Sequence, residues 1–237
     1  MKPDQRVLVA AAPYTLLPTC PEHKVSRREV LRMSFALGAL AFVKPACAAG
    51  TLTPTPDQIR GPFYPVQKPD DGGADLTRLK GRTGQARGQI IYVNGRVLNL
   101  RGEPCPGVQF EVWQANAAGR YRHPRDSNPA SLDPNFDGYA KLSTDAAGRY
   151  RYRTVKPGAY PVSDDYWRPP HIHYDIRGKA DRLVTQMYFD NEPLNQKDPL
   201  LQQSWAKDSL IAKTLPPDAE VEPDARLVVW DIVLVQG

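Results

Sequence analysis

Two histidines one residue apart are the first candidates for chemistry in this chain. His171 and His173 lie in the stretch 167–174, and a β-strand would place both imidazoles on one face, because residues i and i+2 point the same way. Two adjacent imidazoles can share one metal ion. The alternative is a pair of half-buried strand histidines that hydrogen-bond to the backbone. The pair alone does not decide between zinc, copper, iron and no metal.

A metal bound by this histidine pair would need further ligands. The sequence offers neither carboxylates nor imidazoles at the spacings of two common β-sheet metal sites. A cupin-like site would need a carboxylate a few residues on, but Asp175 is only two residues beyond His173 and the next glutamate is Glu192. A site like that of copper–zinc dismutase needs more imidazoles than the three beyond residue 49. Neither pattern fits.

Tyrosine is the ligand type that the chain does offer. Tyr160 lies in a proline-containing loop upstream of the histidines, and Tyr121 lies two residues before His123. Tyrosinate is a natural partner of Fe(III), because a hard, highly charged ion lowers the pKa of a phenol by direct bonding. Spacing does not select these two from the eleven tyrosines of the chain, most of which would be core or rim residues.

The charge of the chain argues against nucleic acid as a partner. The formal net charge is +5, but residues 1–49 hold seven Lys or Arg and three Asp or Glu, which leaves 24 basic and 23 acidic residues beyond them. A nearly neutral remainder gives no basic surface for phosphates.

Residues 1–49 have the pattern of an export signal. The pair Arg27-Arg28 precedes an apolar run at 33–43, and small residues follow up to Ala48 and Ala49. The run is too short to span a bilayer, so we expect no stable membrane insertion. The pattern predicts a twin-arginine-type signal that is cleaved near Ala48 or Ala49 and directs the protein to the periplasm. The alternative is a surface amphipathic segment.

The remaining chain indicates an extended arm followed by a β-rich domain. Residues 50–88 are rich in Pro, Gly and Asp and show little periodicity, whereas residues 89–237 contain short alternating segments separated by turns. The expected strands are 90–93 with 96–98, 108–114, 139–143, 149–155, 171–176, 183–189 and 227–234. Helical spacing is confined to 200–214. The pattern predicts an all-β fold, an antiparallel β-sandwich with long loops and one short helix. Cys105 has no partner beyond residue 49 and is expected to be structural.

Four ordered blocks of this domain resemble the intradiol ring-cleavage dioxygenases, and within that family the iron-bearing (beta) subunits of protocatechuate 3,4-dioxygenases. The blocks are WQANAAGRYRH at 113–123, TVKPGAYP at 154–161, WRPPHIH at 167–173 and TQMYF at 185–189. The resemblance implies one non-heme Fe(III) per chain. The ligands that it implies are Tyr121, Tyr160, His171 and His173.

The resemblance also implies an activity. Members of the family use O₂ to cleave a catechol between its two hydroxylated carbons, which gives a cis,cis-muconate. Arg168 and Gln186 fall on catalytic positions, where Arg168 would stabilise developing negative charge. Tyr160 is the ligand expected to leave and take a proton. His123 is left out of the ligand set. The alternative is an exported metal-binding module that has kept the fold and lost turnover.

Departures from the family pattern concern the substrate. Val162 stands where protocatechuate enzymes carry a tryptophan that walls the pocket, and the loop 160–171 is shorter. Val162 and Arg168 are therefore expected to contact a substrate whose identity stays open, and Tyr64 of the arm is a further candidate. A catechol and O₂ are the expected small-molecule partners. We expect a homo-oligomer, with a related partner subunit as a second option.

Overall fold

The computed structural model describes residues 51–69 and 73–237 of the chain. The predicted export signal, residues 1–49, lies outside these ranges. In the described part, no helix is both long and apolar enough to cross a membrane. The predicted arm is largely without regular structure up to residue 89, and the strands begin at Ile90.

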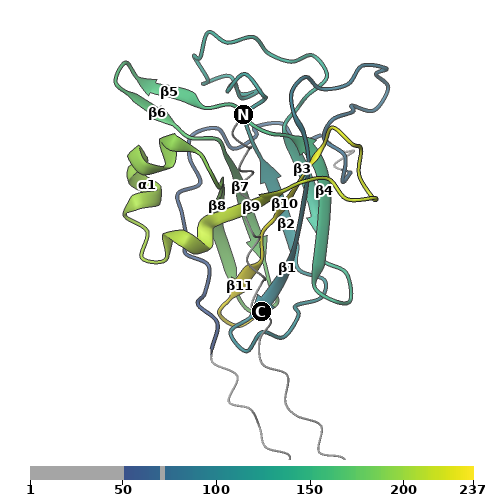
Figure 1. The fold of residues 1–237 in the computed structure, drawn as a ribbon, viewed down its shortest axis with the longest axis vertical. Helices are drawn as coiled ribbons and strands as arrows, with labels where there is room; N and C mark the ends of the chain where they lie inside the picture. Colours follow the sequence, from purple (N-terminus) through teal and green to yellow (C-terminus); the bar gives the residue numbers. More distant parts are fainter. Residues whose placement is uncertain (1–50, 70–72) are drawn as a thin grey trace, which may run out of the picture. The chain divides into compact units, whose positions relative to one another are not determined.

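The described chain is mostly β-structure, as predicted, with one four-residue α-helix (Figure 1). The strands are β1 (Ile90–Asn99), β2 (Gln109–Trp113), β3 (Tyr139–Ser143), β4 (Arg149–Val155), β5 (Tyr160–Ser163), β6 (Tyr166–Arg168), β7 (His171–Arg177), β8 (Arg182–Phe189), β9 (Ile211–Leu215), β10 (Arg226–Val229) and β11 (Ile232–Leu234). The helical turns are η2 (Pro193–Lys197), α1 (Pro199–Gln202) and η3 (Lys207–Leu210).

Nine strands form one sheet in the order β11-β1-β10-β9-β8-β7-β2-β3, with β4 paired to β1, and β5 and β6 form a separate hairpin. The sheet is mixed, which corrects the prediction of a purely antiparallel one. Strand β1 runs parallel to both β10 and β11, and β8 runs parallel to β9. The C-terminal segment returns to pair with β1, and the crossover through residues 190–210 brings β9 parallel to β8. Alternation along a strand shows which face is buried but not which partner lies beside it.

Gly95 permits the crossing of the C-terminal segment over β1. Strand β1 pairs with β10 before this glycine and with β11 after it, and a Cβ built on Gly95 would lie 1.8 Å from the carbonyl oxygen of Trp230. Any larger residue would force the two backbones apart. The two segments 90–93 and 96–98 are therefore halves of one strand that runs through Asn94-Gly95.

The core lies between the two halves of the sheet, which face each other. Phe110 of β2 packs edge-on against Tyr150 of β4, with ring centroids 5.1 Å apart, and the hydroxyls of Tyr152 and Tyr174 are hydrogen-bonded across the core at 2.5 Å. Strand β4 buries its tyrosines and turns its first two arginines outward, as its alternation predicts. This core fixes β7 and β8, which carry His171, His173 and Gln186.

Two local predictions were wrong. The segment 200–214 is not one helix: α1 has four residues, and a 3-10 turn and β9 follow. Its apolar residues serve different elements, because Leu201 and Leu210 pack together with Tyr188 while Trp205 stays 65% exposed. The segment 156–166, predicted as a loop, contains β5 and the start of β6.

Candidate active site

His171 and His173 lie at the start of β7 and share one face of the strand, as their spacing predicts. Each is 2% exposed, and their Nε2 atoms lie 3.2 Å apart. The Nδ1 atom of His171 is 2.7 Å from the carbonyl oxygen of Pro169. A carbonyl only accepts, so Nδ1 carries the proton and Nε2 of His171 keeps its lone pair. The ring of His173 stacks on Trp113, with centroids 4.9 Å apart and planes 6° from parallel.

The structure brings both predicted tyrosines to this histidine pair. Tyr121 follows β2, and its hydroxyl lies 3.4 Å from Nε2 of His171. Its backbone N–H donates to the carboxylate of Asp126 at 2.6 Å, which fixes the loop. Tyr160 begins β5, and its ring centroid is 5.6 Å from the rings of both Tyr121 and His171. Both tyrosines are buried.

Burial sets the protonation of all four groups. It lowers the pKa of His171 and of His173 well below the usual value, and the nearby positive charge of Arg168 acts in the same direction. Burial raises the pKa of Tyr121 well above its usual value, and it raises that of Tyr160 although Arg168 opposes the shift. The site therefore presents neutral imidazoles and neutral phenols, and the phenols would ionise only beside a strong positive charge.

This donor set fits a hard trivalent cation. Two ligands about 2 Å from one ion, at an angle near 100°, stand about 3 Å apart. The separations of 3.2 Å between the imidazole nitrogens and 3.4 Å from Tyr121 to His171 match that spacing. Within residues 51–69 and 73–237 there is no group of three or more His, Cys, Asp or Glu side chains that could hold a metal. The phenols supply the oxygen donors here.

Arg168 ends β6 and extends into the buried space beside these groups. Its Nε donates to the carboxylate of Asp198 at 2.6 Å, and its Nη2 donates to the amide oxygen of Gln186 at 2.7 Å and to the hydroxyl of Tyr188 at 2.9 Å. Arg168 is 5% exposed and Asp198 is fully buried. Burial lowers the pKa of Arg168, but Tyr188, Tyr160 and Asp198 outweigh it and raise the pKa overall. The guanidinium is therefore a fixed and largely buried positive charge.

Sequence reasoning missed Asp198 and Tyr188. Asp198 caps α1, because its Oδ1 accepts from the backbone N–H of Leu201 at 3.1 Å, and Pro199 follows at the first helical position. Asp-Pro before an apolar run does signal a helix start. Nothing local shows that the other carboxylate oxygen faces Arg168, thirty residues upstream.

The arm forms one wall of the site. The carbonyl oxygen of Ile59 accepts from Nε2 of Gln186 at 2.8 Å. Gly61 has φ +72°, and a Cβ on it would lie 3.1 Å from Cε1 of His173. The ring of Phe63 lies 4.8 Å from that of Tyr121, centroid to centroid. Phe63, and not the adjacent Tyr64, therefore covers the phenol rings of Tyr121 and Tyr160.

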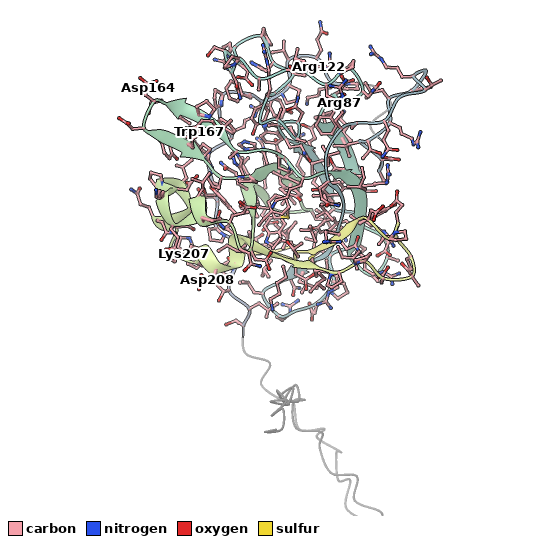
Figure 2. The ribbon with its side chains drawn as sticks, turned by 45° about the horizontal axis from the view of Figure 1, so that its top comes forward. Arg87, Arg122, Asp164, Trp167, Lys207 and Asp208 are labelled. Atoms are coloured by element: carbon pink, nitrogen blue, oxygen red, sulfur yellow. The ribbon has the colours of Figure 1, made fainter. Side chains whose placement is uncertain are left out.

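A cavity of about 770 Å³ opens beside Tyr160 and Arg168, between the arm, the loop after Tyr121 and the β5–β6 hairpin. Val162 lines it and is 58% exposed, and its contact with a substrate stays a prediction. Figure 2 shows Asp164 and Trp167, two further lining residues, together on the hairpin.

Tyr64 lies outside the lining of this cavity. Its ring packs edge-on against Trp113 at 5.0 Å, and its hydroxyl donates to Glu111. A substrate contact by Tyr64 stays a prediction that this placement does not support. His123 faces the arm, where its ring lies 5.8 Å from that of Phe63.

Comparisons with known proteins agree on one family. A family model described as a dioxygenase matches residues 59–236. The chain is 44% identical over 192 residues to the protocatechuate 3,4-dioxygenase beta chain of Burkholderia cepacia, covering 77% of this chain and 81% of the relative. It is 29% identical over 199 residues to a hydroxyquinol 1,2-dioxygenase of a Rhizobium species, covering 78% and 61%.

Solved structures show the same fold. The dioxygenase domain of a dioxygenase carbohydrate-binding protein fusion from Streptomyces sp. SirexAA-E is 27% identical, with a TM-score of 0.60 and coverage of 78% of this chain and all of that one. The 3-chlorocatechol 1,2-dioxygenase of Rhodococcus opacus 1CP is 24% identical, with a TM-score of 0.62 and coverage of 77% and 73%. The second likeness supports the fold alone.

Proposed function

The chain belongs to the intradiol ring-cleaving dioxygenases, and from that premise we propose that it cleaves a catechol between its two hydroxylated carbons. The co-substrate is O₂ and the product is of the cis,cis-muconate type. The observation that carries the proposal is the convergence of two phenols and two neutral imidazoles beside a buried arginine. This set is suited to ferric iron, because phenolate oxygens are hard donors that a highly charged ion favours.

Four residues would hold the metal, namely Tyr121, Tyr160, His171 and His173. When bound, ferric iron supplies withdrawal of electron density from a chelated catechol ring, which opens a ring carbon to O₂. Tyr160 is the one of the four that lines the cavity, and as a metal-bound phenolate it would accept a catechol proton.

Arg168 would stabilise the negative charge that develops on the substrate. The contacts to Asp198, Gln186 and Tyr188 use its Nε and Nη2, so these bonds orient the group without occupying Nη1. A charge that is already held in place costs little reorganisation at the moment of reaction. Gln186 holds the guanidinium through its amide oxygen and is itself held by the arm. Asp198 is in this scheme a positioning residue.

The spectrum of the purified protein tests the ligand set. Iron-loaded protein should be red from tyrosinate-to-iron charge transfer, and Tyr121→Phe or Tyr160→Phe should shift or abolish the colour. Tyr92→Phe, on the far side of the core strands, is the matched control and should leave it unchanged. A colourless protein with a full iron complement would contradict these ligands.

Oxygen uptake with catechol tests the reaction itself. The alternative of a metal-binding module without turnover is not favoured, because the matched family consists of enzymes and Arg168 and Gln186 both lie at the site. A red protein that consumes no O₂ with any catechol would restore that alternative. The proposal also includes export through the twin-arginine signal. It further includes assembly of the chain with copies of itself or with a related subunit, and a relative that is named a beta chain supports such an assembly.

A further inference from the structure

We propose that the ring substituent of the substrate is uncharged and apolar, as in an alkyl- or arylcatechol, and that a carboxylated catechol is a poor substrate. This inference rests on the proposed ring cleavage and concerns which catechol the same cavity selects. Two independent properties of the cavity lining carry it, its charge and its apolar surface.

The charged groups of the lining would repel a carboxylate. Among the described residues that line the cavity, Arg168 is the one cation, and Asp126 and Asp164 are acids. Arg168 is paired with the buried Asp198 at 2.6 Å, and in the proposed reaction its free Nη1 serves the charge of the reacting ring and not that of a substituent. The carboxylate of Asp126 is already held by the backbone N–H groups of Tyr121 and Asn128, so an anionic substituent at the hairpin would meet Asp164 and no second cation of the lining, an arrangement that disfavours it through like charge.

The remaining lining is mostly hydrocarbon and aromatic surface. It includes Ile59, Phe63, Pro129, Val162, Trp167 and Leu200. Val162 and Trp167 keep 58% and 47% of their surface exposed at the hairpin, where the substituent of a bound ring can cover them. A volume of about 770 Å³ is ample for a substituted ring, since ligand cavities commonly measure roughly 300–1,000 Å³. The lining therefore favours binding of a catechol with a large apolar substituent over one with a carboxylate.

The relative named for protocatechuate, a carboxylated catechol, is thus not a guide to the substrate of this chain. The similarity of 44% covers the whole domain, whereas the preference for a substituent depends on the few side chains around the hairpin.

The ranking of four catechols tests the inference. With the iron-loaded full chain, kcat/KM is measured by oxygen uptake for catechol, 4-methylcatechol, 4-tert-butylcatechol and protocatechuate. We expect the alkylcatechols to exceed protocatechuate at least about tenfold, the order expected for one unfavourable charge contact. Anaerobic equilibrium dialysis with the same four compounds gives the ranking of affinities without turnover.

Charge reversal at the hairpin tests whether Asp164 causes the discrimination against a carboxylated catechol. Asp164→Lys should raise the ratio of kcat/KM for protocatechuate to that for catechol by about three- to tenfold. Asp165→Lys, the same change one residue further along the turn and outside the lining, is the matched control and should alter this ratio less than twofold. Trp167→Ala should lower kcat/KM for 4-tert-butylcatechol relative to catechol.

The outcomes separate the two proposals. Protocatechuate that binds and reacts as well as the alkylcatechols would overturn the inference and leave ring cleavage intact. Equal responses of the ratio to Asp164→Lys and Asp165→Lys would also overturn it. Alkylcatechols that bind more tightly than protocatechuate, without consumption of O₂, would support the cavity preference and overturn ring cleavage.

Discussion

Replacing Asp198 with asparagine tests whether Arg168 depends on its buried counterion. The substitution keeps the size of the side chain, and its carbonyl oxygen can still cap α1 at Leu201. It removes the negative charge that faces Nε of Arg168 at 2.6 Å. Both side chains are buried, so water does not replace the lost charge.

The expected magnitude follows from that geometry. Leaving one charge of a buried pair without its partner costs about 3–5 kcal/mol. The one carbonyl oxygen of asparagine is used by the cap, so its amide nitrogen faces Nε of Arg168 and cannot accept from it, and the loss should lie within that range. We expect Asp198→Asn to lower the free energy of unfolding by that amount. We also expect it to lower kcat by about 10–100-fold, because the guanidinium shifts from its fixed position.

Three measurements on one variant give a decisive result. Thermal unfolding reports stability, oxygen uptake reports kcat and KM separately, and the visible spectrum reports the metal ligands, which should not change. Asp208→Asn, on the exposed side of η3, is the control and should match the parent protein in all three (Figure 2). A variant that loses stability but keeps kcat within about twofold of the parent would refute the positioning role of Asp198.

Two further substitutions probe the wall of the site and the acid stability of the fold. Gly61→Ala should lower the melting temperature, because φ +72° disfavours alanine, and it should shift the visible band, because the added methyl group would press on His173. Gly81→Ala is the control: its φ is +76° but its surroundings are open, so it should lower the melting temperature and leave the band unchanged. Burial raises the pKa of Asp175, but the two hydrogen bonds from Arg182 outweigh it and leave the pKa below its usual value. The stability that this carboxylate contributes is therefore present above about pH 4 and is lost as the pH falls through its folded pKa. Chemical denaturation should give Asp175→Asn a lower free energy of unfolding than the parent protein at pH 7, and this difference should shrink below about pH 4. A difference in the free energy of unfolding that does not change with pH would contradict the ion pair.

Features encoded in neighbouring residues could be predicted from the sequence. The face shared by His171 and His173 follows from the two-residue period of a strand, and the alternation of β4 gives its buried tyrosines in the same way. The placement of Tyr121 and Tyr160 beside the histidines did not follow from spacing. It followed from the resemblance of four blocks, which places the two tyrosines together with the histidines in one family.

Features that depend on distant partners could not be predicted. The parallel pairing of β1 with β10 and β11 joins segments about 135 residues apart, and no local pattern encodes it. The apolar spacing at 200–214 is helical, but its residues are divided among a short helix, a turn and a strand that lies between β8 and β10. Phe63 and Tyr64 are both aromatic and adjacent, so only the backbone direction of the arm decides which of them meets the site.

The arm links the chemistry of the site to residues that carry none. Gln186 reaches the guanidinium of Arg168 with its amide oxygen and the carbonyl of Ile59 with its amide nitrogen, so the arm orients the amide that orients the arginine. Gly61 sets the space beside His173, and Phe63 shields the phenols. These contacts reach Gln186, His173 and Tyr121, so a shift of the arm would move all three side chains together. No proposed ligand would need to be replaced for the site to change. We therefore expect activity to depend on the position of residues 55–64 as well as on the proposed ligands, and substitutions there should alter kcat and the spectrum in parallel.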